Sequence, residues 1–219
     1  SPNGQYIFST NNTGSWANDS AVNFTTALSW ANVTKTLSST VGAVIGYRWY
    51  ANDNASNWNS TEINTLTVTD GASPTYSNVA HSSTQAESSA VFSVYWNDNA
   101  ALNPNGKYIF STNNTGSWVN DSPIAFSTTP SWANVTKTLN TTGGLAIGYM
   151  WYANDTNNNW NSTAIQTVTT VDVTPPTYSN VAHNNTNVGQ STLFSAYWND
   201  ETALNGGGRY IFSTNNTGT

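Results

Sequence analysis

The most frequent pattern in this sequence that could be chemically modified is Asn followed two positions later by Ser or Thr. When the middle residue is not Pro, this tripeptide, a sequon, accepts N-linked glycans on extracellular proteins. It occurs 14 times in 219 residues, including Asn23 and Asn54. The predicted glycan acceptors are Asn11, Asn18, Asn32, Asn59, Asn113, Asn120, Asn134, Asn140, Asn154, Asn161, Asn184 and Asn215.

The positions of the sequons say more than their number. With 34 Asn and 60 Ser plus Thr in the chain, chance alone gives about 9 such tripeptides. Four sites, however, recur at one spacing, as Asn11/Asn113/Asn215, Asn18/Asn120, Asn32/Asn134 and Asn59/Asn161. Asn134 is also expected to share a polar strand face with Thr136 and Thr138. Dense N-glycosylation of an extracellular surface is therefore predicted.

Carboxylates form a second candidate site. Asp98 and Asp155 each follow a predicted strand, and we expect them to meet at one end of a domain, near Asp70 in the segment that enters it. Clustered oxygen ligands of this kind could hold Ca²⁺. The alternative is that Asp and Asn simply end strands and cap turns, as they often do. No other cofactor is expected.

Catalytic chemistry is not predicted. The chain has no Cys, and its two His, His81 and His183, occupy one repeat position with no acidic partner in sequence. The neighbours Asp200 and Glu201 correspond to Asp98 and Asn99 one repeat earlier, so this pair of side chains is not kept between copies. Such a constellation is unlike an active site. We therefore expect that the protein is not an enzyme.

Exposed aromatic rings would support a different function. Trp118, Trp132 and Trp160 lie near predicted turns, and sugar-binding proteins stack sugar rings on exposed Trp. The alternative is that five Trp per repeat fill the core, because large aromatic side chains bury much apolar area. A carbohydrate-binding role is kept as the second hypothesis.

These candidate residues lie in a tandem repeat. The segment YIFSTNNTG at residues 6–14 recurs at 108–116 and 210–218, a constant spacing of 102 residues. SWANVTKTL at 29–37 and PTYSNVAH at 74–81 recur at the same offset. A period near 100 residues is the size of a domain with its own core. The predicted divisions are a partial repeat at 1–73 with strands three to seven, a complete repeat at 74–175 and a partial repeat at 176–219 with strands one to three.

Composition excludes several classes of protein. Only 7% of residues are charged and the net charge is −6, so the chain cannot neutralise a nucleic-acid backbone. No segment reaches the roughly 18 apolar residues of a membrane helix. Neither a nucleic-acid partner nor a membrane segment is expected within these residues.

Alternating apolar and polar residues predict strands. In VFSVYWNDN at residues 91–99, for example, Phe92, Val94 and Trp96 share one face. Clusters of Asn, Gly, Asp and Pro separate such runs, and no helix is predicted. The expected strands of the middle repeat are 75–80, 90–96, 107–112, 123–127, 134–139, 145–153 and 165–171. About seven short strands per repeat predict an all-β antiparallel sandwich.

The order of these elements resembles a known group of repeats. A strand ending in WND, a YIF strand, an NTG turn and the segment GYMWYANDTNNNWN from residue 148 are similar to the Ig-like and fibronectin type III-like tandem repeats of archaeal and bacterial surface proteins, including S-layer-type proteins. The resemblance implies that Tyr149, Trp151, Ala153 and Asp155 belong to the sixth strand of a sandwich. Tyr47, Trp49, Ala51 and Asp53 are their equivalents in the first repeat.

The sequence and the resemblance together predict a non-enzymatic, extracellular structural protein. Its expected partner is itself, in a head-to-tail array or filament, either as one continuous chain or through strands donated between copies. A surface adhesin or carbohydrate-binding repeat, with other cells or surface glycans as partners, is the alternative.

Overall fold

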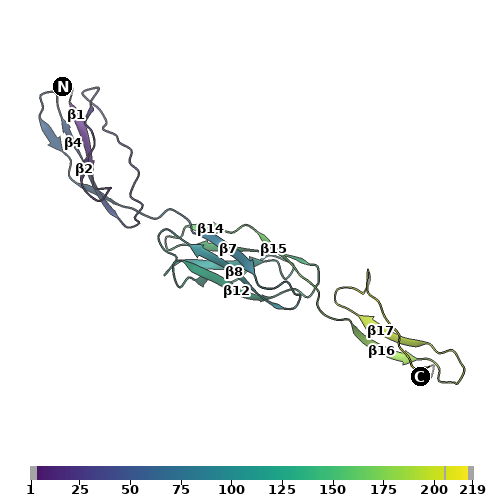
Figure 1. Ribbon diagram of the computed structural model, residues 1–219. Coiled ribbons are helices and arrows are strands. Elements are labelled where there is room, and N and C mark those ends of the chain that lie inside the picture. The colour runs from purple at the N-terminus through teal and green to yellow at the C-terminus, as the bar shows by residue number, and fades with distance from the viewer. Residues whose placement is uncertain (1–3, 205, 217–219) are drawn as a thin grey trace. The chain divides into compact units, whose positions relative to one another are not determined.

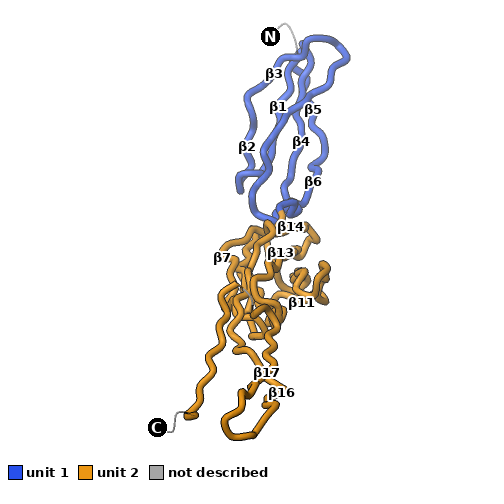
Figure 2. Tube along the Cα trace, turned by 90° about the vertical axis from the view of Figure 1, so that its right-hand side faces the viewer, with its two compact units in different colours: residues 1–72 blue, residues 73–219 orange. Residues whose placement is uncertain are grey.

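The computed structural model describes residues 4–204 and 206–216, and its strands are all paired antiparallel in four sheets. The described residues contain no helix, as predicted. By compactness, the chain divides into two units, residues 1–72 and residues 73–219 (Figure 2).

The middle repeat forms a β-sandwich. One sheet contains three strands in the order β12-β8-β7, and the other contains six strands built around β9 and β13 (Figure 1). The first sheet consists of β7 (Thr75–His81), β8 (Ser89–Asn97) and β12 (Ser131–Thr138). The second consists of β9 (Lys107–Thr112), β10 (Val119–Asn120), β11 (Ile124–Ala125), β13 (Ala146–Asn154), β14 (Trp160–Ser162) and β15 (Gln166–Thr169).

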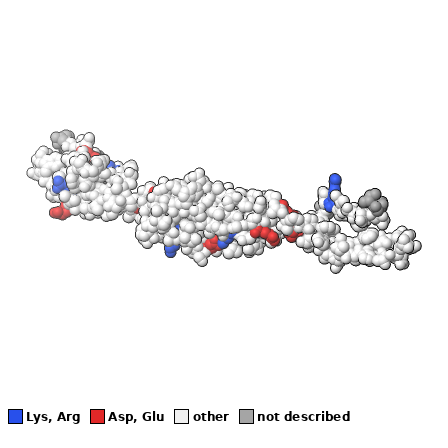
Figure 3. Space-filling model, turned by 60° about the horizontal axis from the view of Figure 1, so that its bottom comes forward, with Lys and Arg blue, Asp and Glu red and all other residues white. Residues whose placement is uncertain are grey.

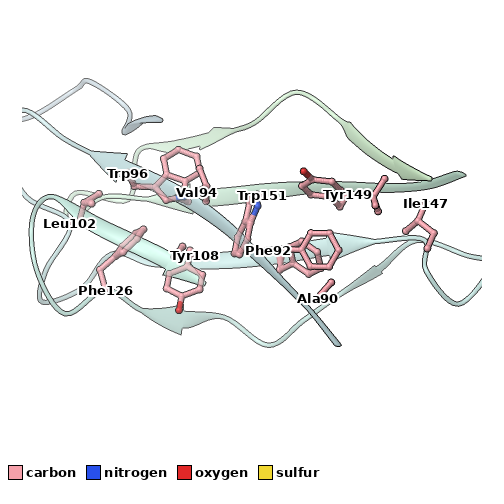
Figure 4. Close-up of a cluster of buried hydrophobic side chains, with 14 of the residues drawn as sticks. Ala90, Phe92, Val94, Trp96, Leu102, Tyr108, Phe126, Ile147, Tyr149 and Trp151 are labelled. Atoms are coloured by element: carbon pink, nitrogen blue, oxygen red, sulfur yellow. The ribbon is translucent and has the colours of Figure 1, made fainter. Parts of the chain in front are cut away.

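Aromatic side chains from the two sheets meet in one core. Phe92 of β8 lies 4.9 Å from Phe110 of β9 and 4.8 Å from Tyr149 of β13, measured between ring centroids. Trp151 packs 4.8 Å from Phe110 and is completely buried. Figure 4 shows the rings of Phe92, Tyr149 and Trp151 between the strands. The strict alternation of buried and exposed residues along β8 places Phe92 and Trp96 inward, as predicted.

All seven predicted strands of the middle repeat are present, with ends that shift by one to three residues. The range 107–112 is the same in the structure, while the predicted 123–127 shrinks to the two residues of β11. The short strands β10 and β14 were not predicted. These two strands are too short for an alternating pattern to be recognised in the sequence. Each forms because it pairs with a longer strand, β10 with β9 and β14 with β13.

The N-terminal unit contains one six-stranded sheet with the same pairings as its counterpart in the middle repeat. Its strands are β1 (Gln5–Thr10), β2 (Ala17–Asn18), β3 (Val22–Asn23), β4 (Val44–Asn52), β5 (Trp58–Ser60) and β6 (Asn64–Thr67). Phe8 of β1 faces Trp49 of β4, as Phe110 faces Trp151 one repeat later.

Two segments that form strands in the middle repeat do not form them elsewhere. SWANVTKT is β12 at 131–138 but has no strand structure at 29–36, and the third strand expected in the last repeat, at 210–214, is not formed either. The expectation of a strand at each of these two positions was wrong. Each segment lacks the strand that pairs with it in the middle repeat, and backbone groups without a partner strand cannot form a ladder. Among its described residues, the last repeat therefore contributes only β16 (Thr177–His183) and β17 (Phe194–Asn199).

No helix among the described residues has the length and apolar character needed to cross a membrane.

Candidate glycosylation sites and carboxylate clusters

Four of the sequons that recur between repeats expose their Asn. Asn134 lies on the outer face of β12 with Thr136 and Thr138, which confirms the predicted polar face, while the preceding Ala133 is buried. Asn120 is exposed at the end of β10. Their equivalents in the first repeat, Asn32 and Asn18, are exposed as well. Each of these four residues is therefore exposed to solvent, as attachment of a sugar requires.

In a second group of predicted acceptors, the side-chain amide makes hydrogen bonds within the fold. The Oδ1 atoms of Asn11 and Asn113 accept hydrogen bonds of 2.7 Å from the backbone N–H of Gly46 and Gly148, respectively. Nδ2 of Asn161 donates to the carbonyl of Pro74 at 2.7 Å. These bonds hold the ends of strands and turns in place.

Asn154 is the predicted acceptor that lies deepest in the fold. Only 7% of its surface is exposed. Its Oδ1 accepts a hydrogen bond from the Lys107 backbone N–H at 2.7 Å, and its Nδ2 donates to Asn158 Oδ1 at 3.0 Å. Asn52 accepts the same bond from Gln5 in the first repeat. This side chain ties the end of β13 to the start of β9.

The other predicted acceptors lie in or beside loops. Nδ2 of the half-buried Asn140 donates to the Asn114 carbonyl at 3.1 Å. Oδ1 of the exposed Asn184 accepts from the Leu193 N–H at 2.8 Å. Asn59 is exposed in β5, and Asn215 is exposed outside any strand.

The structure brings Asp98 and Asp155 together, as predicted, with carboxylate oxygens within 4.8 Å of each other. Asp155 is 1% exposed, and it accepts hydrogen bonds from the backbone N–H groups of Asn157 and Asn159 and from the Asn159 side chain, at 2.8, 2.9 and 2.8 Å. Asp98 caps the following turn through the N–H groups of Ala100 and Ala101. Both side chains thus hold turns, the role that the simpler interpretation gave them.

One repeat later, Asp172, Asp200 and Glu201 also lie within 4.8 Å of one another. Hydrogen bonds, first from the Thr174 backbone and then from side chains of Thr202 and Glu201, lower the pKa of Asp172. Asp70 is the equivalent of Asp172 in the preceding repeat, and its Oδ1 accepts from the Ala72 N–H at 3.1 Å. Carboxylates grouped in this way have the oxygen chemistry of Ca²⁺ ligands, but the turns use the same oxygens.

His81 is half-buried and lies against the core. Its Nδ1 lies 3.2 Å from the Tyr149 hydroxyl, and its ring meets the Tyr149 ring edge-on. Burial raises the pKa of Tyr149 above its usual value. Burial also raises the pKa of Tyr108, with a hydrogen bond to the backbone of Asn134 acting in the opposite direction. His81 therefore packs against the interior of the sandwich.

Trp residues divide into buried and exposed groups. Trp96 and Trp151 fill the core, whereas Trp118, Trp132 and Trp160 are 45%, 48% and 46% exposed. The expectation that most Trp are buried therefore fails in the middle repeat. Figure 3 shows that charged side chains are few on the face it presents.

Two of these Trp have surroundings that the sequence did not reveal. A Cβ added to Gly148 would lie 3.0 Å from Trp118, so that this glycine makes room for the ring. Trp160 lines a cavity of about 350 Å³ together with Lys107, Asp155 and Asn158.

No protein-family model matches the chain, and a search of curated proteins finds no match to its sequence.

Proposed function

We propose that this chain is a structural repeat segment of an extracellular filament or cell-surface fibre, built from head-to-tail Ig-like β-sandwiches that carry N-linked glycans. The observation that carries the proposal is the recurrence of one sequence unit every 102 residues without insertion or deletion. A chain of near-identical domains presents the same surface at fixed intervals, which suits a repetitive structural role.

The recurrence extends to the pairing of individual residues. In the β7–β8 hairpin, Thr75 pairs with Asn97, and in the β16–β17 hairpin Thr177 pairs with Asn199. Both hairpins carry the same irregularity two residues after the paired Thr, beginning at Ser77 and Ser179. Copies that agree in such detail support a repeated structural unit rather than domains specialised for separate tasks.

The surface composition supports an extracellular, glycosylated protein. Charged residues make up only 7% of the chain, so solubility must come from other polar groups. Sugars on the exposed Asn120 and Asn134, and on their equivalents, would add bulk and hydration at the same places in every repeat. The same sugars would hinder proteases.

A non-enzymatic role is part of the proposal. The one His of the middle repeat packs against Tyr149 in the core, and Asp98 and Asp155 cap turns. These side chains, which are the most reactive types in the repeat, thus have structural partners that explain their presence.

The alternative proposal is a surface adhesin or carbohydrate-binding repeat. It is favoured by the exposed Trp160 beside a cavity of about 350 Å³, which is large enough for a small ligand. Binding of purified chain to an array of oligosaccharides tests it. Loss of a binding signal in Trp160→Ala would support this alternative, and an array without signal would exclude it for the sugars present.

Two measurements test the main proposal. The sequence of the complete gene should contain further copies of the 102-residue repeat, whereas a single divergent binding domain next to two copies would favour the adhesin. The intact mass of the protein from its natural source should exceed the mass of the polypeptide by several glycans. A mass equal to the polypeptide alone would refute glycosylation.

A further inference from the structure

Four of the sequons share a feature that their acceptor function does not require. In each, a Trp precedes the Asn by two positions, as Trp16/Asn18, Trp30/Asn32, Trp118/Asn120 and Trp132/Asn134. Alternate residues of a strand point to the same face, roughly 7 Å apart along it. Where the backbone is extended, as in β12, this spacing places an indole ring next to the acceptor Asn.

The pair Trp132 and Asn134 displays this geometry directly. Both lie on the outer face of β12, between the inward-facing Ser131, Ala133 and Val135. Trp132 is 48% exposed, and across the strand pair it contacts Tyr95, with ring centroids 5.1 Å apart. Asn134 faces the small Ser93. The outer face of this sheet thus carries a two-ring aromatic surface beside an open acceptor amide.

The pair Trp118 and Asn120 shows how such a ring is fixed in place. Trp118 lies over Gly148 of β13, where any side chain larger than hydrogen would come within 3.0 Å of the indole. Trp16 lies over Gly46 at the same distance in the first repeat. Each ring packs on the sheet and still leaves 45% of its surface to solvent. A ring held in this way loses little conformational freedom when a ligand covers it.

A sugar attached to the neighbouring Asn suits such a surface. The faces of an aromatic ring carry partial negative charge, and the C–H groups of a pyranose ring are weak donors that pack against them. One contact of this kind would not hold a free sugar. A covalent link makes the contact intramolecular, with an effective concentration on the order of millimolar or above, so the contact is populated far more than it would be with the same sugar free and dilute.

We propose that Trp132 and Trp118 are docking platforms for the protein's own glycans, and that they bind the first sugar attached to Asn134 and Asn120, respectively. The inference rests on the glycosylation in the proposed function. It also gives the exposed indoles an occupant, so that these rings are covered in the mature protein rather than free to bind foreign sugars.

The test uses the complete chain secreted from a host that adds N-linked glycans, trimmed enzymatically to a single N-acetylglucosamine on each Asn. In proton NMR spectra, the C–H resonances of the sugar on Asn134 should shift upfield because of the Trp132 ring current. The shift should vanish in Trp132→Ala and persist in Trp132→Phe. The sugar on Asn184 is the matched control, since Ala182 stands where the other sites have Trp.

Thermal unfolding supplies a second readout. Removal of the sugar from Asn134, by Thr136→Ala, should lower the unfolding temperature of the wild-type glycoprotein more than that of Trp132→Ala, since only the former loses a sugar–indole contact. An unmodified Asn134 in the secreted protein would overturn the inference together with glycosylation at this site. A modified Asn134 with unshifted sugar resonances, and equal temperature changes in both backgrounds, would overturn the docking inference alone.

Discussion

The imidazole Nδ1 of His81 lies 3.2 Å from the hydroxyl oxygen of Tyr149 and joins β7 to β13 through the interior of the central sandwich. The contact crosses between the two sheets, and Phe92 lies 4.8 Å from the same Tyr149 ring. A phenol in this position keeps its proton more strongly than one in water, because the anion would be buried without a compensating charge.

Stability should therefore fall at alkaline pH. The folded pKa of Tyr149 and Tyr108 is raised above the value of 10.0 expected for the unfolded chain. The contribution of these groups is fully present below pH 10 and is lost as the pH rises through the folded pKa, because the unfolded chain releases the protons first. Urea unfolding between pH 8 and about 11.5 should show this decline. The decline of the unfolding free energy with pH should be shallower in Tyr149→Phe than in the unmodified protein, and shallowest in the double variant Tyr108→Phe/Tyr149→Phe. Equal slopes in the three proteins would contradict the burial of these phenols.

Truncation of the central indole should have a large effect. Trp151 is completely buried, so Trp151→Ala should cost about 3–5 kcal/mol of unfolding free energy. Trp151→Phe should cost less, since it leaves a smaller cavity and removes a buried indole N–H that has no partner among the described residues. The matched control is Trp49→Ala, at the half-buried equivalent position of the first repeat. Denaturant unfolding followed by circular dichroism measures all three, and an equal loss at both repeat positions would be inconsistent with the difference in burial.

Asp155 and Asp53 form a second matched pair. Each accepts the same three hydrogen bonds from the loop that follows it, but Asp155 is buried and Asp53 is exposed. Asp155→Ala should cost about 1–3 kcal/mol, because it leaves buried N–H groups unpaired. Asp53→Ala should cost less, as water replaces the carboxylate. Thermal unfolding of both variants measures the two losses of stability. A larger loss in Asp53→Ala than in Asp155→Ala would contradict the role of burial.

Glycan occupancy should follow the exposure of each acceptor. Glycopeptide mapping of the protein from its natural source should find sugar on Asn120 and Asn134, whose side chains are exposed. Asn154 should be empty, because it is 7% exposed and its Nδ2 is hydrogen-bonded to Asn158. A sugar on Asn154 with none on Asn134 would contradict the proposed surface.

The strands of the middle repeat could be predicted because their alternation is long enough to recognise. The same reasoning could not decide what SWANVTKTL does in each repeat. At 131–138 it is β12, since the residues of β8 from Trp96 to Ser89 pair with it, whereas at 29–36 the identical letters form no strand. Strand formation depends on a partner, which local sequence does not contain.

The candidate sites divide in the same way. The meeting of Asp98 with Asp155 could be predicted, because both end strands at one end of the sandwich. The burial of Asn154 could not, because a sequon shows only which residue types are present. The indole of Trp118 lies over Gly148, which is 30 residues further along the chain, so only the folded sheet reveals this contact.

The central claim is that these repeats build an extracellular fibre, and electron microscopy of the producing cells tests it most directly. Antibodies raised against the folded 219-residue chain, and coupled to gold, should label filaments or a surface layer outside the cells at many points along their length. Gold particles confined to the cell interior, or a surface without label on cells that synthesise the protein, would contradict the claim.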